Sequence, residues 1–178
     1  LGATGSGKSS IALLLQRMYA PQTGKITISG HDIRTIARKH LRSRVGLVLQ
    51  EPFLYSKTIY ENLRMAAPHA SREEIEAAAG DAQALEFIQD SEKGWETLVG
   101  ERGVTLSGGQ KQRAAIARTL LKNNDILIFD DSLSAVDTQT DARIREALRR
   151  RSLGVTTVII SHRILTLSQA DLILVLEE

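Results

Sequence analysis

The sequence lacks cysteine, long apolar runs and an excess of either charge. Without cysteine there are no disulfides, thiolate metal sites or cysteine nucleophiles, which is compatible with the cytosol but does not require it. No uninterrupted apolar run reaches the roughly 18 residues of a membrane-spanning helix. The 23 Lys and Arg nearly balance the 21 Asp and Glu, so the net charge of +2 gives no reason to expect nucleic acid as a partner.

The beginning of the chain, LGATGSGKSS, has no basic region followed by an apolar stretch, and therefore does not resemble a signal peptide. A phosphate-binding motif starts at Gly2, without the strand that normally precedes it. The last residues stop just after an apolar run. We therefore expect a domain truncated at both ends, and any membrane part of the protein to lie outside this chain.

Apolar runs alternate with helical patterns, which predicts an α/β fold with a mostly parallel sheet. The runs are short and continuous, as in strands covered by helices on both faces. The predicted strands are residues 45–50, 125–130, 155–161 and 171–176, with a shorter one at 25–29. The chain is long enough for about one domain with its own core.

The middle of the chain, approximately residues 56–124, contains no convincing strand. Ser71 and Glu74 have the spacing of a capping box, and a helix is predicted over residues 73–89. We interpret this stretch as a helical subdomain inserted into an α/β core formed by approximately residues 1–55 and 125–178.

The motif at residues 2–9, GATGSGKS, matches the P-loop pattern. Its glycines allow backbone N–H groups to converge on phosphate oxygens, and the helix predicted over residues 8–19 directs its positive end at the same anion. Lys8 is expected to reach the β- and γ-phosphates, and the Ser9 hydroxyl to bind Mg²⁺. A flexible Gly/Ser linker is the alternative, but a Leu-rich helix follows directly. The candidate nucleotide-binding residues here are Gly2, Ala3, Thr4, Gly5, Ser6, Gly7, Lys8, Ser9 and Ser10.

Asp130 ends the apolar run ILIFD. In P-loop NTPases a carboxylate in this place holds Mg²⁺. By itself the pattern is common, but together with an upstream P-loop it supplies the expected second half of a Mg-ATP site.

The stretch 106–110, LSGGQ, resembles the signature motif of ATP-binding cassette (ABC) proteins, and the other motifs of that family occur in the right order. The resemblance implies that Leu106, Ser107, Gly108, Gly109 and Gln110 bind nucleotide. Gln50 resembles the Q-loop residue, which senses Mg²⁺ and the attacking water, Asp137 lies in a segment similar to the D-loop, and His162 resembles the switch histidine. The Mg²⁺ ligands implied are Ser9, Gln50 and Asp130, and the catalytic residues are Gln50, Asp131 and His162. The other histidines, His31, His40 and His69, are interpreted as ordinary surface or structural residues.

The resemblance also implies a dimer. Ser107 and Gly109 stand at the start of a predicted helix, where N–H groups and a hydroxyl can meet an anion. In this family the signature helix meets ATP bound to the opposite protomer, so ATP joins the two domains and hydrolysis releases them. The expected partners are a second nucleotide-binding domain and a transmembrane domain at the cytoplasmic face of a membrane.

Two segments resemble the exporters of this family. Residues 97–103, TLVGERG, are similar to the X-loop, which contacts the coupling helices of the membrane domain, and residues 52–63 are similar to the stretch after the Q-loop. We therefore expect contacts with the membrane domain through the Gln50 region and the Glu101 region. The transported substrate and the residue that stacks on adenine cannot be identified from this sequence.

Asp131 departs from the family pattern, which has Glu at this position. The side chain is one methylene shorter, and a misplacement on the order of 1 Å can cost about a hundredfold in rate. The hypothesis is a heterodimeric exporter in which this site binds ATP but hydrolyses it slowly, while its LSGGQ completes the partner's site. A homodimer that uses Asp at reduced speed is the alternative.

Three functions of other kinds remain open. A soluble ABC ATPase without a membrane partner is one, although the X-loop resemblance disfavours it. A mainly non-catalytic nucleotide-binding module is another, to which Asp131 gives some support. A small-molecule kinase with a P-loop is the most distant, because it does not require LSGGQ.

Overall fold

The computed structural model describes residues 1–3, 5–122, 124–151, 154–161 and 170–176. The helices are α1 (Lys8–Leu15), α2 (Arg38–Arg44), α3 (Ile59–Arg64), α4 (Arg72–Asp81), α5 (Leu85–Asp90), α6 (Gly108–Leu120) and α7 (Thr138–Arg151), with short 3₁₀ turns η1 (Gly94–Glu96) and η2 (Glu101–Gly103). The strands are β1 (Thr27–Ile28), β2 (His31–Asp32), β3 (Val45–Val48), β4 (Ile126–Asp130) and β5 (Thr156–Ile160). Among these elements, no helix combines the length and apolarity needed to cross a membrane.

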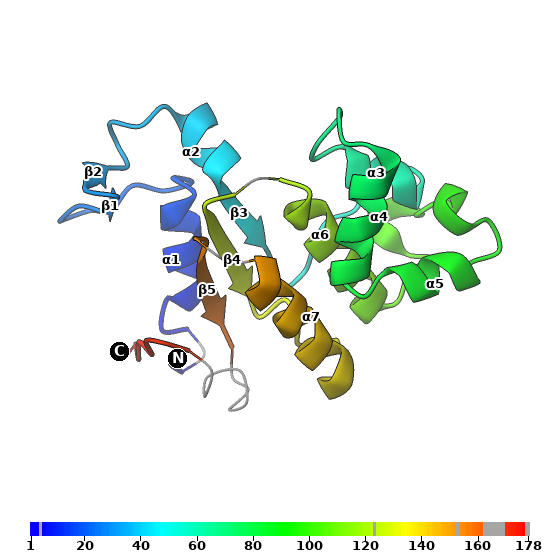
Figure 1. Ribbon diagram of the computed structural model, residues 1–178. Helices are drawn as coiled ribbons and strands as arrows, with labels where there is room; N and C mark the ends of the chain where they lie inside the picture. Colours follow the sequence, from blue (N-terminus) through cyan, green and yellow to red (C-terminus); the bar gives the residue numbers. More distant parts are fainter. Residues whose placement is uncertain (4, 123, 152–153, 162–169, 177–178) are drawn as a thin grey trace.

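The predicted α/β fold with a parallel sheet is confirmed. Strands β3, β4 and β5 pair in that order, both pairs parallel, with Val45 opposite Ile126 and Ile126 opposite Thr156. Figure 1 shows α1 on one side of this sheet and α6 and α7 on the other. Because all three strands are parallel, their carboxyl ends lie at one edge, and the segments that follow them are neighbours.

Both faces of the sheet are covered, which explains why its strands are apolar throughout rather than alternating. Side chains still alternate between two cores. Leu127 and Phe129 of β4 pack with α3 to α7, whereas Ile128 packs with α1 and α2 on the opposite face. The larger core is continuous from the sheet to the helices of residues 59–120, so the division at residues 56 and 124 stays a prediction.

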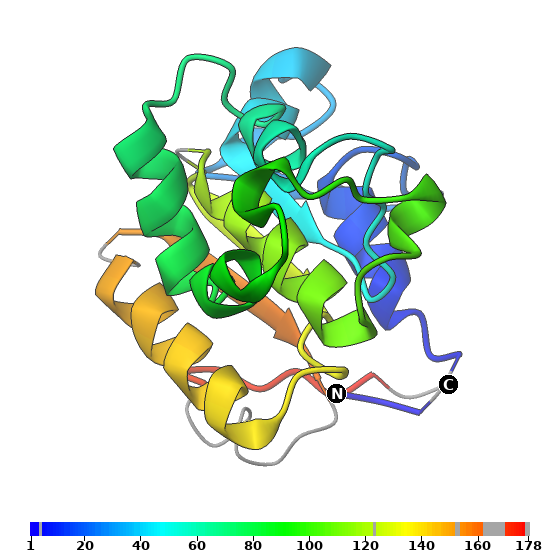
Figure 2. The same cartoon turned by 90° about the vertical axis from the view of Figure 1, so that its right-hand side faces the viewer.

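Helix α6 approaches β3 closely because Gly46 has no side chain. A Cβ at this position would lie 2.6 Å from Asn124 Oδ1 and 2.8 Å from Thr119 Cγ2. Asn124 is itself buried and donates to the Ser43 carbonyl over 3.1 Å. Figure 2 shows α6 in front of the sheet, between it and the other helices of this region. The helix that begins with the LSGGQ glycines is thus packed directly against the strand that leads to Gln50.

The strand predicted at residues 171–176 is wrong. Within this segment only Leu176 forms a bridge, to Gly2, and Leu172 to Val175 are exposed. The neighbouring backbone is that of Leu1, whose N-terminal amine donates to the Leu174 carbonyl and whose carbonyl accepts from the Leu176 N–H. These two bonds and the single bridge do not form a continuous ladder, so the segment is not a strand in this structure.

Two predicted helices are shorter than expected. The helix predicted over residues 73–89 is two helices, α4 and α5, separated at Gln83, which has a φ of 53°. The helix predicted from Lys8 to Tyr19 ends at Leu15, followed by Arg17 at a φ of 52°. A left-handed residue ends a right-handed helix, and neither break involves the Gly or Pro that usually marks one in a sequence. The predicted Ser71–Glu74 capping box is present at the start of α4.

The strand predicted at residues 25–29 is present only as Thr27–Ile28, paired antiparallel with β2. Ser29 and Gly30 connect the two strands, with φ values of 50° and 81°. Two consecutive residues with positive φ are typical of the tight turns in two-residue hairpins. Asp32 in β2 accepts hydrogen bonds from Arg34, whose side chain and backbone N–H lower the pKa of this carboxyl to about 2.

The start of α7 is fixed by Asp137. Its Oδ1 accepts hydrogen bonds from the backbone N–H groups of Gln139 (3.1 Å) and Thr140 (2.9 Å). The Thr140 N–H is the main reason that the pKa of this carboxyl lies below its usual value. A charged cap at a helix N-terminus also interacts favourably with the helix dipole. The loop between β4 and α7 is therefore fixed at one end by β4, which ends at Asp130, and at the other end by the Asp137 cap.

Replacing Gly46 by Val should lower the free energy of unfolding of the intact protein by roughly 1–3 kcal/mol, because the added carbons overlap α6 and Asn124. Urea unfolding measures this difference. Gly80→Ala is the control, since its Cβ meets only the end of the Leu85 side chain, at 3.3 Å, and a helical Ala is intrinsically favourable. Equal stability of the Gly46→Val variant and the wild type would show that the approach of α6 to β3 is not tight.

The cap at Asp137 predicts a pH dependence. A carboxyl whose pKa is lowered on folding contributes stability above its unfolded pKa, and loses it as the pH falls through the lower folded value. Asn caps about as well as Asp without titrating. The stability advantage of the wild type over Asp137→Asn should therefore shrink between roughly pH 5 and 3.

Thermal melts of wild type, Asp137→Asn and Asp137→Ala at several pH values test this expectation. The Ala variant lacks the cap at every pH, so it should be the least stable at neutral pH. A pH-independent difference between wild type and Asp137→Asn would contradict the role given to the carboxylate.

Candidate nucleotide-binding site

The P-loop forms the turn that its glycines predict. Gly5 and Gly7 have φ values of 91° and 87°, in the region that glycine adopts without strain, and a Cβ at either would meet nothing within 4 Å. Gly7 is the N-cap of α1, and no side chain caps the helix. The first backbone N–H groups of α1 therefore have no partner within the helix or from a capping side chain, and the positive end of the helix dipole faces the same space. This is an anion-binding geometry.

Lys8 lies over the same loop. Its Nζ donates to the carbonyl of Gly2 (2.8 Å), to the carbonyl of Ala3 and, over 3.3 Å, to the Ser6 hydroxyl. The ammonium is thus held within the loop, where it adds a full positive charge to the N–H groups. Of the other expected residues, Ser9 and Ser10 lie in the exposed first turn of α1. Thr4 lies outside the described residues.

The P-loop lies at the edge of the sheet toward which β3, β4 and β5 point (Figure 1). Asp130, the last residue of β4, is only 6% exposed. It therefore has a fixed position at that edge, as expected of a carboxylate that ends a buried strand. A ligand placed on the P-loop lies in the crevice outside the carboxyl ends of parallel strands, the usual binding place in open α/β sheets.

Asp131 has a constrained backbone. Its φ is 44°, its N–H donates to the carbonyl of Ile160 (2.9 Å), and its own carbonyl accepts from the Ser134 N–H (3.1 Å). Asp is one of the few residues besides glycine found repeatedly in this left-handed region. The side chain lines a small pocket together with Ser132 and Ser161. His162, the expected switch histidine, lies outside the described residues.

The LSGGQ motif begins α6. Ser107 is the N-cap and forms a capping box with Gln110: the Ser107 hydroxyl accepts from the Gln110 N–H (3.3 Å), and the Gln110 side chain accepts from the Ser107 N–H (2.8 Å). The N–H groups of Gly108 and Gly109 lie at the N-terminus of a 13-residue helix and have no partner within it, and the hydroxyl proton of Ser107 lies beside them. The Gln110 side chain thus fixes the backbone at Ser107, at the start of the motif. Leu106 is buried and anchors the motif.

The signature glycines also touch the predicted D-loop. A Cβ on Gly109 would lie 2.9 Å from the carbonyl oxygen of Ala135, and one on Gly108 would lie 3.5 Å from the Ala135 Cβ. Gly109 is therefore required by the close approach of the loop after β4, independently of any ligand. In this chain the start of α6 contacts the D-loop, and the P-loop contacts the segment around Leu176.

One polar residue of the site was not predicted from the sequence. Gln112 of α6 is 3% exposed, and its side chain bonds to the carbonyl of Gln50 and to the N–H of Ala135. Gln50 itself is exposed, as a residue that meets a ligand must be. The available signal was position: Gln112 is a polar residue four positions before Ile116 and eight before Leu120, on the apolar stripe of the helix.

The expected Mg²⁺ ligands provide oxygen donors: the Ser9 hydroxyl, the Gln50 amide and the Asp130 carboxylate. The described residues contain no group of three or more His, Cys, Asp or Glu that could enclose a metal ion by itself. Mg²⁺ usually binds through one or two carboxylates, keeps several waters and shares substrate phosphates. One buried carboxylate beside a phosphate-binding loop fits that ion.

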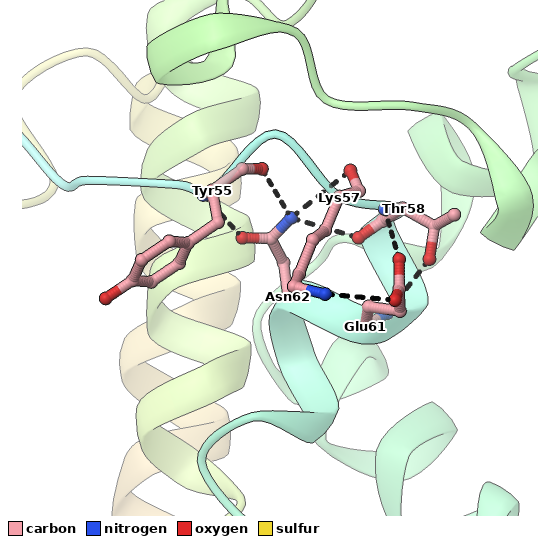
Figure 3. A network of polar contacts seen from close by, with 5 residues as sticks. All are labelled: Tyr55, Lys57, Thr58, Glu61 and Asn62. Atoms are coloured by element: carbon pink, nitrogen blue, oxygen red, sulfur yellow. Dashed lines mark hydrogen bonds and ion pairs between the residues drawn. The ribbon is translucent and has the colours of Figure 1, made fainter.

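The segment after Gln50 is held by a polar network (Figure 3). The buried Asn62 side chain accepts from the Tyr55 N–H (2.8 Å) and donates to the carbonyls of Tyr55 and Thr58, each over 3.0 Å. Thr58 and Glu61 form the capping box of α3, and the Thr58 N–H and Lys57 lower the pKa of Glu61. This network fixes the backbone, while the Tyr55 ring packs edge-on against Phe53 at the surface.

The two segments that resemble exporter sequences lie side by side. Thr58 bridges Leu98, the Ile59 N–H donates to the Thr97 carbonyl, and the Val99 N–H donates to the Lys57 carbonyl. Both segments expose apolar side chains, and Val104 directly follows the second segment. The exposed fractions are 51% for Phe53, 45% for Tyr55, 62% for Leu98 and 75% for Val104.

Comparison with known proteins is consistent with this geometry. The family model described as ABC transporter matches residues 1–134. The chain is 52% identical over 175 residues to ABC transporter B family member 4 of Dictyostelium discoideum, covering 98% of this chain and 23% of that protein. It is 49% identical over 175 residues to the beta-(1→2)glucan export ATP-binding/permease protein NdvA of Nitrobacter winogradskyi, covering 98% of this chain and 29% of that protein. The chain thus spans about a quarter of the length of these relatives.

A solved structure agrees with both the fold and the sequence. The structure of a bacterial Atm1-family ABC exporter with ATP bound superposes with a TM-score of 0.96 at 45% identity, over 99% of this chain and 31% of that one. The match therefore includes both the sheet and the helices of residues 59–120. With its P-loop, its LSGGQ helix and these relatives, the chain belongs to the ABC transporter family, as an ATP-binding domain of the exporter type.

Proposed function

We propose that this domain binds Mg-ATP on its P-loop and hydrolyses it in a head-to-tail dimer, to drive export through a transmembrane domain at the cytoplasmic face of a membrane. The observation that carries the proposal is the pair of helix N-termini at the starts of α1 and α6, of which α1 has no capping side chain and α6 is capped by Ser107 with the Gly108 and Gly109 N–H groups beside it. One has the Lys8 ammonium and glycines with left-handed φ, and the other has the Ser107 hydroxyl. Each supplies half of the contacts that a triphosphate needs.

The proposed dimer is supported by the different neighbours of the two half-sites within one domain. The start of α6 contacts its own D-loop at Ala135, and the P-loop contacts the segment around Leu176. A second domain arranged head-to-tail lets the Gly108 and Gly109 N–H groups of one domain meet the phosphates on the P-loop of the other. The dimer then binds two nucleotides, each between the P-loop of one domain and the LSGGQ motif of the other.

The residues at the edge of the sheet have different proposed roles in ATP binding and hydrolysis. Ser9, Asp130 and Gln50 would hold Mg²⁺, which neutralises charge on the β- and γ-phosphates when it is bound. Lys8 binds the phosphates. Asp131 is placed to orient the attacking water and accept its proton, and His162 is proposed to contact the γ-phosphate from the segment after β5.

Asp131 makes this site slow. The Glu usual in the family would reach about one methylene further, and a backbone shift toward the phosphate could compensate. That shift is opposed here, because the Asp131 N–H is bonded to Ile160 and its carbonyl to Ser134. We propose a heterodimer in which this site mainly binds ATP, and in which the LSGGQ of this chain completes a faster site on a partner that has Glu. A homodimer hydrolysing at reduced speed is the second candidate.

The exposed side chains of Phe53, Tyr55, Leu98 and Val104 form the proposed docking surface for the transmembrane domain. The surface joins the Gln50 region to the Glu101 region through the backbone contacts between residues 57–59 and 97–99. The Asn62 network keeps it rigid. A soluble ABC ATPase has no need for such a surface, so the structure gives that alternative less support.

Asp131→Glu in the intact transporter should raise ATP turnover by about tenfold or more at this site, because the carboxylate regains the missing reach. Lys8→Ala should leave part of the total turnover if the partner's site is the faster one. Steady-state ATPase assays of the reconstituted transporter measure both. If Lys8→Ala abolishes activity and Asp131→Glu changes little, both sites hydrolyse and the asymmetry proposed here is wrong.

Replacing both Phe53 and Leu98 by Ala should reduce substrate transport per ATP hydrolysed at least several-fold, because apolar contact area with the membrane domain is lost. ATP affinity should stay within about twofold of the wild type, since neither residue contacts the P-loop. Tyr19→Ala is the control, as it removes an exposed aromatic side chain four residues after the end of α1. Unchanged transport per ATP in the double variant would remove this surface as the docking site.

A further inference from the structure

Gln112 makes the most specific set of buried polar contacts among the described residues of the site. Its Nε2 donates to the carbonyl of Gln50 (3.2 Å) and to the Ser134 hydroxyl (3.4 Å), and its Oε1 accepts from the Ala135 N–H (3.1 Å). The orientation of the amide is chemically determined, because a backbone carbonyl can only accept and a backbone N–H can only donate. Each end of this one side chain therefore has a different, obligatory partner.

The two partners belong to different loops. Gln50 follows β3, and Ala135 lies in the loop that leaves β4. Since β3 and β4 are adjacent parallel strands, both loops emerge at the edge of the sheet where the P-loop lies. Loops that emerge at the same edge can still move apart. The Gln112 amide connects the two loops, because it bonds to Gln50 in one and to Ala135 in the other.

The loop after β4 transmits the position of Ala135 to Asp131. The Ser134 N–H donates to the Asp131 carbonyl (3.1 Å), so residues 131–135 form a tight turn. Gly109, three residues before Gln112 on α6, is in contact with the Ala135 carbonyl as well. A displacement of Ala135 therefore changes the relation of Asp131 both to Gln50 and to the LSGGQ motif.

A second side chain of α6 reaches only one of the loops. Arg118 Nη2 donates to the carbonyl of Phe53 over 2.9 Å, and burial lowers the pKa of this guanidinium. Arg118 and Gln112 together hold the segment 50–53 against α6 at two points. Gln112 also bonds to the loop that carries Asp131, at Ser134 and Ala135.

We propose that Gln112 is a positioning residue for ATP hydrolysis, which fixes the spacing between the Gln50 loop, the Asp131 loop and the LSGGQ helix. The inference rests on the proposed hydrolysis of ATP and adds a residue that acts without touching the nucleotide. The proposed phosphate-binding residues belong to the P-loop and α1, whereas the hydrogen bonds of the Gln112 side chain go to Gln50, Ser134 and Ala135. Loss of Gln112 should therefore impair the chemical step and leave ATP binding nearly intact.

The main test is Gln112→Met in the intact reconstituted transporter. Met conserves the volume but leaves the Gln50 carbonyl and the Ala135 N–H without their partners. We expect kcat for ATP to fall about tenfold or more, because the LSGGQ helix that carries Gln112 completes the proposed faster site as well. KM should change by less than about twofold, which is the pattern of a lost transition-state arrangement.

Gln16→Met is the matched control. Gln16 is also a buried Gln, and its Nε2 donates to the carbonyl of Val45, at the far end of β3 from the nucleotide site. This variant loses a comparable buried hydrogen bond and should retain most of the wild-type kcat. A kcat in Gln112→Met no lower than in Gln16→Met, with the wild type active, would overturn the inference alone. An inactive wild type would overturn the proposed function itself.

Hydrogen exchange supplies a readout that does not depend on turnover. The Ala135 N–H donates to the Gln112 side chain and is thereby protected from exchange. The amides of residues 131–137 should therefore exchange faster in Gln112→Met than in the wild type, and at the wild-type rate in Gln16→Met. Gln112→Glu retains an acceptor for Ala135 but not the donor to Gln50, and should show near-normal exchange there with a kcat as low as that of Met. If Gln112→Met does not assemble, the Glu variant is decisive: wild-type kcat in it would overturn the proposal.

Discussion

The parallel register of β3 against β4 is the constraint on which the rest of the site depends. Pairing Val45 with Ile126 and Val48 with Phe129 brings the ends of the two strands to one edge, with Asp130 as the last residue of β4 and Gln50 two residues after β3. Parallel strands require long connections, and here the connection between β3 and β4 includes helices α3 to α6. The same pairing that brings Gln50 and Asp130 to one edge of the sheet therefore also places α6, which starts with the LSGGQ glycines, beside that edge.

Helix α6 is the element through which the parts of the site are related. It packs on Gly46 of β3, its first residues touch Ala135, and its side chains hold the backbone at Gln50 and Phe53. Small residues permit these approaches and buried amides or guanidinium groups fix them. Packed cores respond to force by moving as units rather than by bending. We therefore expect a displacement of the surface around Phe53 to move α6 and, through it, the Asp131 loop.

Much of the fold and of the site could be predicted from the sequence, and the exceptions have physical causes. Strands β3, β4 and β5 lie within three of the predicted apolar runs, and the Ser71 and Ser107 helix starts follow local capping chemistry. The run at residues 171–176 is as apolar as the true strands, but in this structure it forms a single bridge, at Leu176, and no ladder. The break at Gln83 left no Gly or Pro signal, because the residue is held at positive φ by its surroundings.

The sequence by itself determined the chemistry: a glycine-rich loop followed by Lys8 and Ser9, a carboxylate at the end of an apolar strand, and a helix that starts with Ser-Gly-Gly. These depend on local geometry, since each is set by the φ preferences and hydrogen bonds of a few consecutive residues. Only the tertiary structure decided which of these parts touch. Gln112 occurs 62 residues after Gln50 and 23 before Ala135 in the chain, and nothing in its neighbours indicates either partner. Such a contact arises from the packing of a helix on a parallel sheet, which is a property of the whole core and not of any single segment.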